Sequence, residues 1–187
     1  MKLAKLRARR AARIRKRKHH YKAFERFKKA KKKGKAAWHL TRFKWQKRAI
    51  KRIERLIDKA EAKKRWAYLH GKYAGCEALI KYEVEPCVAR HRGNGLVTSG
   101  KRWETYGNPG SDHYAGNTTA SARDFALSND QEMARILYGV LSGGSPSAWP
   151  GDYSEFFIER YGVTFRIQII AVTHGTGPHL HCGVKRV

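Results

Sequence analysis

The sequence predicts a long basic α-helical arm over residues 1–72, followed by a small α+β domain over residues 73–187 with an antiparallel sheet and flanking helices. Charge is the first reason for this division: residues 1–72 contain 30 Lys and Arg and 4 acidic residues, whereas residues 73–187 contain 11 of each. The second is that helix-forming residues dominate the first part, with no proline before Pro86. The third is a run of alternating apolar residues near the end of the second part, which is typical of β-strands.

Apolar residues recur at helical spacing in two stretches of the arm. In the second stretch the steps of three, four and seven place them on one stripe of an amphipathic helix. These residues are Leu40, Phe43, Ile50, Ile53, Ile57 and Ala60. A looser stripe precedes them, at Leu3, Leu6, Ile14, Tyr21, Phe24 and Phe27. The stretch from Lys31 to Lys35, around Gly34, predicts a break, so we expect two helices, which can fold as a hairpin with their stripes facing.

The excess charge of the arm points to a partner of opposite charge. The net charge of the chain is +26, and like charges at this density repel one another unless a polyanion or an acidic protein surface is bound. Nucleic acid, an acidic virion protein and the anionic polymers of a bacterial wall all fit. The alternative is a solvated helix, although the charge exceeds what solubility requires. No motif for reading a DNA sequence is present.

The arm contains no apolar run near the roughly 20 residues that a membrane span needs. Its Lys and Arg are spread throughout, so the short apolar core of a secretory signal is missing as well. The sequence therefore predicts neither a membrane span nor a secretion signal.

The second part opens with a helix predicted over Cys76–Val84, which Pro86 ends or kinks. The short apolar run Leu96–Ser99 between two glycines predicts a strand. The three cysteines are odd in number and lack the spacing of a zinc finger, which predicts reduced, mostly buried thiols and leaves one Cys76–Cys87 bridge open. They are Cys76, Cys87 and Cys182.

Two further helix starts are indicated by capping spacings. Ser128 with Gln131 has the spacing of a capping box and precedes apolar residues at helical steps, followed by glycines that end a helix. The residues after this start are Met133, Ile136, Leu137, Val140, Leu141, Gly143 and Gly144. Asp152 with Glu155 has the same spacing and predicts a shorter helix that stops near Gly162.

Beyond Val163 the apolar pattern alternates, which predicts a strand that ends at Thr173. A turn is expected over residues 175–178, followed by a final strand. In that strand a period of two places His179 and His181 on one face. The opposite, apolar face carries Leu180, Cys182 and Val184.

Two distant stretches, residues 111–124 and 174–184, carry the side chains that hold a metal ion or move a proton: His113, Asp124, His174, His179 and His181. Both rings of a His-x-His on a strand point the same way, which suits a metal, although hydrogen-bonded structural histidines show the same pattern. A set of His, Asp and His leaves a fourth position open for water, as in a catalytic zinc site.

At these residues the sequence resembles the zinc D-alanyl-D-alanine carboxypeptidase and dipeptidase superfamily, which includes Hedgehog signalling domains and many phage endolysins. Ser111, His113, Gly116, Ala122 and Asp124 are similar to its Ser-x-His…Gly…Ala-x-Asp motif, and HLHCGV resembles its terminal His-x-His strand. The segment of residues 98–102 resembles the Ser-Gly-x-Arg strand that precedes the first ligand. The similarity covers roughly residues 76–187.

The resemblance implies a zinc ion on His113, Asp124 and His181, with His179 lining the site and Arg102 holding a substrate carboxylate or the developing oxyanion. Ten residues separate His113 from Asp124, where the motif has about six. The family also has a Glu or Asp shortly before the last zinc histidine, whereas no acid follows Glu159 here. His174 is then the nearest candidate base. Otherwise a carboxylate reaches in from elsewhere, or the domain binds zinc without hydrolysing a bond.

The sequence therefore leads to the hypothesis of a phage-associated, zinc-dependent peptidase acting on peptidoglycan peptides, located in the virion, or in the host cytoplasm before lysis. Its basic arm would tether it to an acidic virion protein or to DNA. Two alternatives stay open. The domain is a retained, inactive scaffold in a structural protein, or the arm is the active part of a DNA-associated protein.

Overall fold

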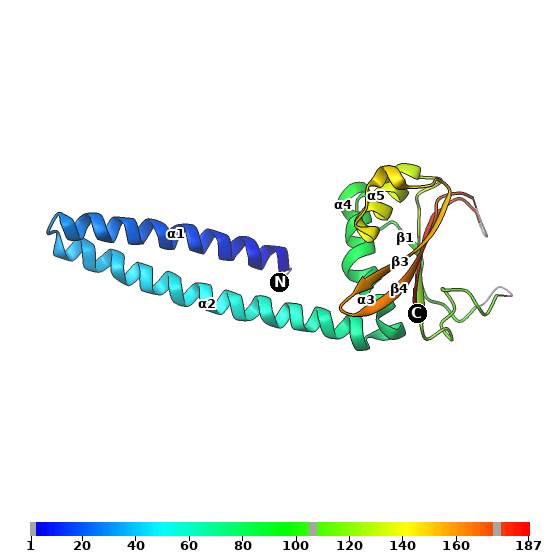
Figure 1. Cartoon of the computed structure of the whole chain (residues 1–187), viewed down its shortest axis with the longest axis horizontal. Helices are drawn as coiled ribbons and strands as arrows, with labels where there is room; N and C mark the ends of the chain where they lie inside the picture. Colours follow the sequence, from blue (N-terminus) through cyan, green and yellow to red (C-terminus); the bar gives the residue numbers. More distant parts are fainter. Residues whose placement is uncertain (1–2, 105–107, 174–176) are drawn as a thin grey trace. The chain divides into compact units, whose positions relative to one another are not determined.

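The computed structural model describes residues 3–104, 108–173 and 177–187. It divides into two compact units, Met1–Lys63 and Lys64–Val187, which we describe one at a time (Figure 1). The division lies inside a helix, α2 (Lys33–His70), and falls before the boundary expected after Lys72.

The first unit is an antiparallel helical hairpin. Helix α1 (Leu3–Lys29) lies against α2, as shown by the pairs Arg7 to Glu61 at 2.7 Å and Arg10 to Glu54 at 2.7 Å, whose sequence numbers converge toward the turn. The turn is centred on Lys31, which has a left-handed φ of 54°. The predicted break is close to this position, but Gly34 lies inside α2.

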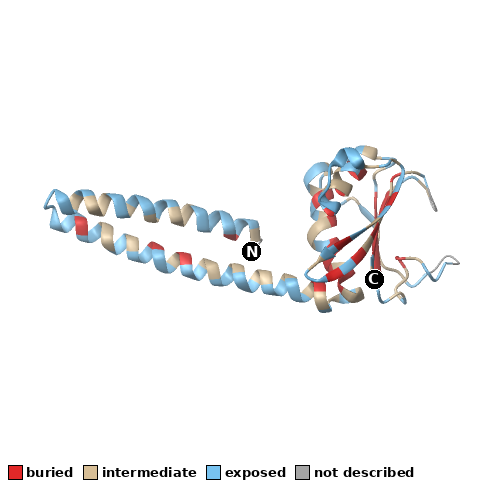
Figure 2. Ribbon diagram, in the orientation of Figure 1, coloured by how far each residue is buried: buried red, intermediate tan, exposed pale blue. Residues whose placement is uncertain are grey.

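Few side chains of the hairpin are buried, and both helices are mostly exposed (Figure 2). The buried ones are Leu6, Ala36, Gln46 and Ile50. Most of the apolar stripe predicted for each helix is therefore only half-buried.

The second unit begins with the last turns of α2, where Tyr68 is fully buried. A short 3₁₀ segment (Lys72–Gly75) leads into α3 (Cys76–Leu79), a π-turn (Ile80–Val84) and α4 (Glu85–Arg92). Pro86 lies in the first turn of α4, where a missing backbone N–H costs little. The helix predicted over Cys76–Val84 therefore continues past the proline through the π-turn.

Helix α5 (Gln131–Ser142) matches the predicted apolar spacing and ends at Gly143, which has a left-handed φ of 71°. Its N-cap, however, is Asp130, whose carboxylate accepts the Met133 N–H at 2.8 Å. The capping box expected at Ser128 was wrong by two residues. A short 3₁₀ turn (Pro146–Ala148) follows α5.

Five strands form one antiparallel sheet in the order β1-β2-β5-β4-β3. They are β1 (Val97–Ser99), β2 (Ala120–Phe125), β3 (Tyr153–Arg160), β4 (Val163–Ile170) and β5 (Leu180–Arg186). The helix predicted from Asp152 and Glu155 was wrong, because that stretch forms β3, hydrogen-bonded to β4 along its whole length. Asp152 and Tyr161, at the two ends of β3, have left-handed φ values of 45° and 56°.

The core lies between the sheet and the helices, which cover one face of the sheet (Figure 1). The alternating residues of β4, Val163, Phe165, Ile167 and Ile169, are buried on this face, as are Leu180, Cys182 and Val184 of β5. All three cysteines are free and buried. The fold of this unit is α+β with an antiparallel sheet, and the helices leave its second face open.

Candidate metal centre

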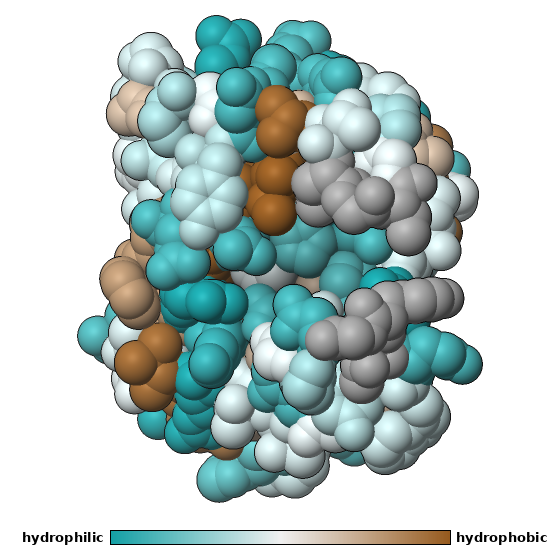
Figure 3. Space-filling view, turned by 90° about the vertical axis from the view of Figure 1, so that its right-hand side faces the viewer, coloured by the Kyte–Doolittle hydropathy of each residue, from teal (hydrophilic) through white to brown (hydrophobic). Residues whose placement is uncertain are grey.

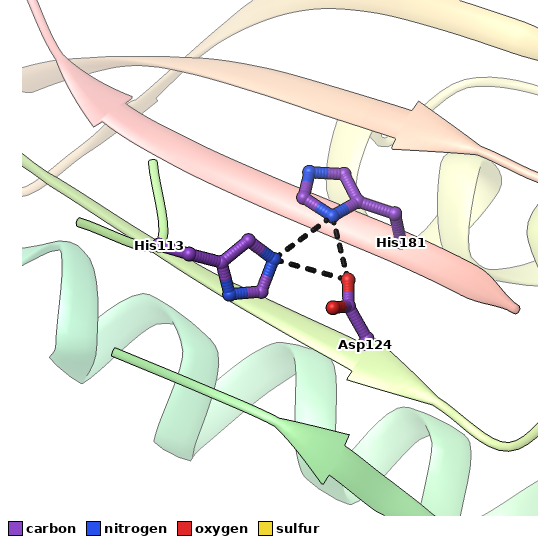
Figure 4. A group of neighbouring side chains, drawn as sticks. All are labelled: His113, Asp124 and His181. Atoms are coloured by element: carbon purple, nitrogen blue, oxygen red, sulfur yellow. Dashed lines mark hydrogen bonds and ion pairs between the residues drawn. The ribbon is translucent and has the colours of Figure 1, made fainter. Parts of the chain in front are cut away.

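Three predicted ligands meet on the open face of the sheet. Asp124 Oδ1 lies 2.8 Å from His181 Nδ1 and 3.0 Å from His113 Nε2, and the two histidine nitrogens are 3.2 Å apart (Figure 4). All three side chains are buried, with at most 8% of each residue exposed. Among the residues that the structure describes, these three bring their histidine and carboxylate ligand atoms close enough together to hold one metal ion.

Strand pairing places two of the three ligands. Asp124 of β2 is the direct partner of His181 in β5, so their side chains leave the sheet at the same level and on the same face. The neighbours Phe125 and Leu180 form the next pair and point into the core. The period of two thus fixes which side chains face the metal centre and which face the helices.

His113 comes from a loop. Its backbone N–H donates to Ser111 Oγ at 3.2 Å, and its carbonyl accepts the Arg102 N–H at 2.9 Å. The ring Nδ1 donates to the Gly100 carbonyl oxygen at 2.8 Å. A carbonyl oxygen can only accept, so Nδ1 carries the proton, and the neutral ring directs its Nε2 lone pair at the other two ligands.

This tautomer makes the close approach informative. The Nε2 lone pair of His113 faces a carboxylate oxygen at 3.0 Å, and two acceptors at that distance repel unless a positive charge lies between them. Either a second proton on His113 or a bound cation removes the conflict. A cation at this point could also be bound by His181 Nδ1, which lies close to His113 Nε2 and to Asp124 Oδ1.

The electrostatics of Asp124 favour a cation as well. Burial alone would raise the pKa of this carboxyl group, but its contacts with the His113 and His181 rings outweigh burial and hold the pKa well below its usual value. The carboxylate is therefore ionised at neutral pH and can bind a cation.

The donor set fits zinc. Zn–N and Zn–O bonds of about 2.0–2.2 Å in tetrahedral geometry separate the ligand atoms by roughly 3.3 Å. The three separations of 2.8–3.2 Å are slightly shorter. A shift of a few tenths of an ångström in each side chain would open the site to that size.

The other predicted site residues differ in their placement. His179 joins the cluster, because its Nε2 lies 3.4 Å from Asp124 Oδ1. The backbone of Arg102 holds the His113 loop, and its guanidinium donates to the Ser99 hydroxyl. His174 lies outside the described residues.

Asp112 and Gly183 lie beside the outer nitrogen of His181, and the sequence did not predict this placement. Asp112 is buried and accepts a hydrogen bond from Arg166 Nη2 at 2.8 Å. A Cβ on Gly183 would lie 2.7 Å from Asp112 Oδ2 and 3.1 Å from His181 Nε2. Asp112 and the outer nitrogen of His181 therefore share a space that only glycine leaves free.

The face that the helices leave open is hydrophilic around a hollow (Figure 3). Beside Asp124 and His181, the same row across the sheet continues with Ile170 of β4 and Tyr153 of β3. The next row contains Gln168 and Glu155. This part of the face therefore presents amide, hydroxyl and carboxylate groups beside the apolar side chain of Ile170.

Among the described residues, no helix is both long and apolar enough to cross a membrane. Comparison of the chain with protein-family models, with curated proteins and with solved structures finds no match.

Proposed function

We propose that the second unit is a zinc-dependent peptidase that hydrolyses peptides of peptidoglycan. The observation that carries this proposal is the convergence of His113 Nε2, Asp124 Oδ1 and His181 Nδ1 on one point of the open sheet face. Zinc bound there would supply Lewis-acid activation of a water molecule and of a peptide carbonyl. The resemblance of the ligand motifs to the carboxypeptidase and Hedgehog-like superfamily supports a peptidoglycan stem or cross-bridge peptide as substrate.

Each residue of the site has a separate role in the proposed hydrolysis. The carboxylate of Asp124 stays ionised and neutralises positive charge at the centre. His179, 3.4 Å from that carboxylate, is placed to donate a hydrogen bond to a reacting oxygen or to move a proton. In this proposal Arg102 binds a substrate carboxylate or the oxyanion, and His174 acts as the base.

In the same proposal, the arm holds the enzyme to an acidic virion protein or to packaged DNA in a bacteriophage particle. Glu54 and Glu61 of the hairpin pair with Arg10 and Arg7. Between Arg13 and Arg52 the sequence contains a single acid, Glu25, among many Lys and Arg. The positive charge is therefore concentrated toward the turn of the hairpin, which is where a polyanion would bind.

A structural role is the second candidate, and the absence of any acid after Glu159 favours it. In that case the domain is an inactive scaffold that keeps its zinc. A third candidate, a DNA-associated protein, makes the arm the active part. Salt-sensitive binding of duplex DNA by a wild-type protein that neither binds zinc nor hydrolyses peptidoglycan would support this candidate.

Metal content and wall hydrolysis, measured on the same samples, test the proposal. Purified wild-type protein should contain one zinc per chain, and His113→Ala and His181→Ala should each lose it. His91→Ala is the matched control, because His91 is an exposed histidine of the same unit. Release of peptides from purified peptidoglycan should follow the zinc content.

Each outcome separates the candidates. Zinc with hydrolysis that both ligand substitutions abolish supports the peptidase, and His174→Ala or His179→Ala should then retain zinc and lose activity. Zinc without hydrolysis supports the inactive scaffold. A wild-type protein that binds no zinc contradicts the proposal.

A further inference from the structure

Lys101 makes an unusual set of contacts beside the metal centre. Its ammonium group donates to the backbone carbonyl oxygens of Asp112 at 3.1 Å, of Asn117 at 2.9 Å and of Tyr114. An ammonium has three protons, so these three acceptors use all of them. The ring of Tyr73 covers the group, with its centre 4.3 Å from Nζ.

These carbonyls lie on both sides of His113 in the chain. The stretch from Ser111 to Thr119 belongs to no strand and is held internally by turn hydrogen bonds, such as Tyr114 N–H to Ser111 O at 3.0 Å. Lys101 therefore closes a loop that regular secondary structure does not support.

Lys101 is the middle one of three consecutive residues, 100–102, that form hydrogen bonds with this loop. The carbonyl of Gly100 accepts the His113 ring proton, and the backbone of Arg102 pairs with His113 O and with the Ala115 N–H at 2.7 Å. Gly100 orients the His113 ring, the backbone of Arg102 holds the loop beside residues 113–115, and Lys101 binds the loop on both sides of His113.

We propose that Lys101 is a positioning residue for the metal centre, which acts by presenting His113 to the metal. The proposal rests on the metal site described above and adds to it a group that touches neither the metal nor the substrate. An apolar side chain here would remove the ammonium donor from three carbonyl oxygens, of which that of Tyr114 also accepts the Asn117 N–H at 3.0 Å. Arginine is a poorer substitute, because its planar fork cannot point at three converging acceptors as a compact ammonium does.

The test is the zinc affinity of Lys101→Met, measured by competition with a chelating dye. Loss of an outer support of a metal ligand costs about 10–100-fold in metal affinity, and we expect a loss in that range. The visible spectrum of bound Co²⁺ should also change, because a displaced His113 alters the ligand field. Lys101→Arg should recover part of the affinity. Lys185→Met, at an exposed lysine of β5, is the control and should bind like the wild type.

Zinc affinity and a Co²⁺ spectrum in Lys101→Met that both equal those of the wild type would overturn the proposal. If Lys101→Met does not fold, the zinc affinities of Lys101→Arg and Lys101→Gln test the proposal instead. Affinity should fall from wild type to Arg to Gln, and equal affinities would contradict the role.

Failure of the metal site itself gives a different result. If the wild type binds no zinc, the ring Nδ1–H of His113 still reports the loop by NMR, because its hydrogen bond to Gly100 protects it from exchange. Its signal should persist in the wild type and disappear in Lys101→Gln. A signal that persists in both proteins would show that Lys101 does not position His113.

Discussion

Gly183 is the position in β5 where an added methyl group would disturb the metal centre most directly. We expect Gly183→Ala to lower zinc affinity by about tenfold or more, because its Cβ would displace Asp112 Oδ2 and press on the outer nitrogen of His181. Dye competition measures the effect. Gly34→Ala is the control, since a Cβ there meets nothing within 4 Å. Unchanged affinity in Gly183→Ala would show that the space is not needed.

The sequence predicted that His113, Asp124 and His181 form one group, which the structure brings together, but not the residues that surround them. The three were recognisable because their segments resemble the Ser-x-His…Ala-x-Asp and His-x-His motifs of a zinc peptidase superfamily. The roles of Lys101 and Gly183 depend on what lies opposite them in space, and nothing in the residue type reveals it. Asp112 belongs with them, because it is buried and pairs with Arg166 at 2.8 Å.

Helix α5 depends on Asp130, which caps its first turn and also binds Arg92 at 2.7 Å. The hydrogen bond from Arg92 lowers the pKa of Asp130, burial opposes this effect, and the Met133 N–H adds to it. Because the pKa is lower in the folded protein, the resulting stability is fully present above the ordinary value of 3.8 and is lost as the pH falls through the folded value.

Asp130→Ala should therefore reduce the free energy of unfolding at pH 7 by about 1 kcal/mol through the lost cap. Asp130→Asn keeps a capping oxygen and should cost less. The difference between wild type and Asp130→Asn should shrink as the pH falls below 3.8 and then through the lower pKa of the folded protein, because the carboxyl group becomes protonated first in the unfolded and then in the folded chain. Urea unfolding at pH 7 and at low pH measures this. A difference that stays constant with pH would contradict the assigned pKa.

The elements show why spacing alone can mislead. Asp152 and Glu155 have capping-box spacing, yet the residues that follow alternate in burial: Ser154 and Ile158 face the core, whereas Glu155 and Phe157 face solvent. The alternation of inward- and outward-facing residues that is typical of a strand was present in the sequence. In so short a stretch, however, the four-residue spacing of a capping box competes with it. Pairing with β4 over eight residues decided the outcome. The arm was easier to predict, since long helices repeat their signal many times.

The two units should differ sharply in their resistance to a protease. The hairpin buries few side chains, whereas the second unit contains a continuous core of helices and sheet. Limited trypsin digestion should therefore remove the Lys- and Arg-rich arm at least about ten times faster than it cleaves the second unit, because cleavage follows local opening. Mass spectrometry should find a stable fragment that starts between residues 64 and 72. Equal rates of loss would show that the hairpin is as stable as the domain.

The order of the strands in the sheet has a consequence for how the chain folds during its synthesis on the ribosome. Strand β5 is the last of the five to be synthesised, yet it lies between β2 and β4 in the sheet. Until it emerges, β2 and the β3–β4 hairpin have no common neighbour, and His181 cannot meet Asp124. The helical hairpin of the first unit is made earlier and can form before His181 and Asp124 are brought together. Pairing β5 with β2 joins residues more than fifty positions apart, a contact that forms slowly.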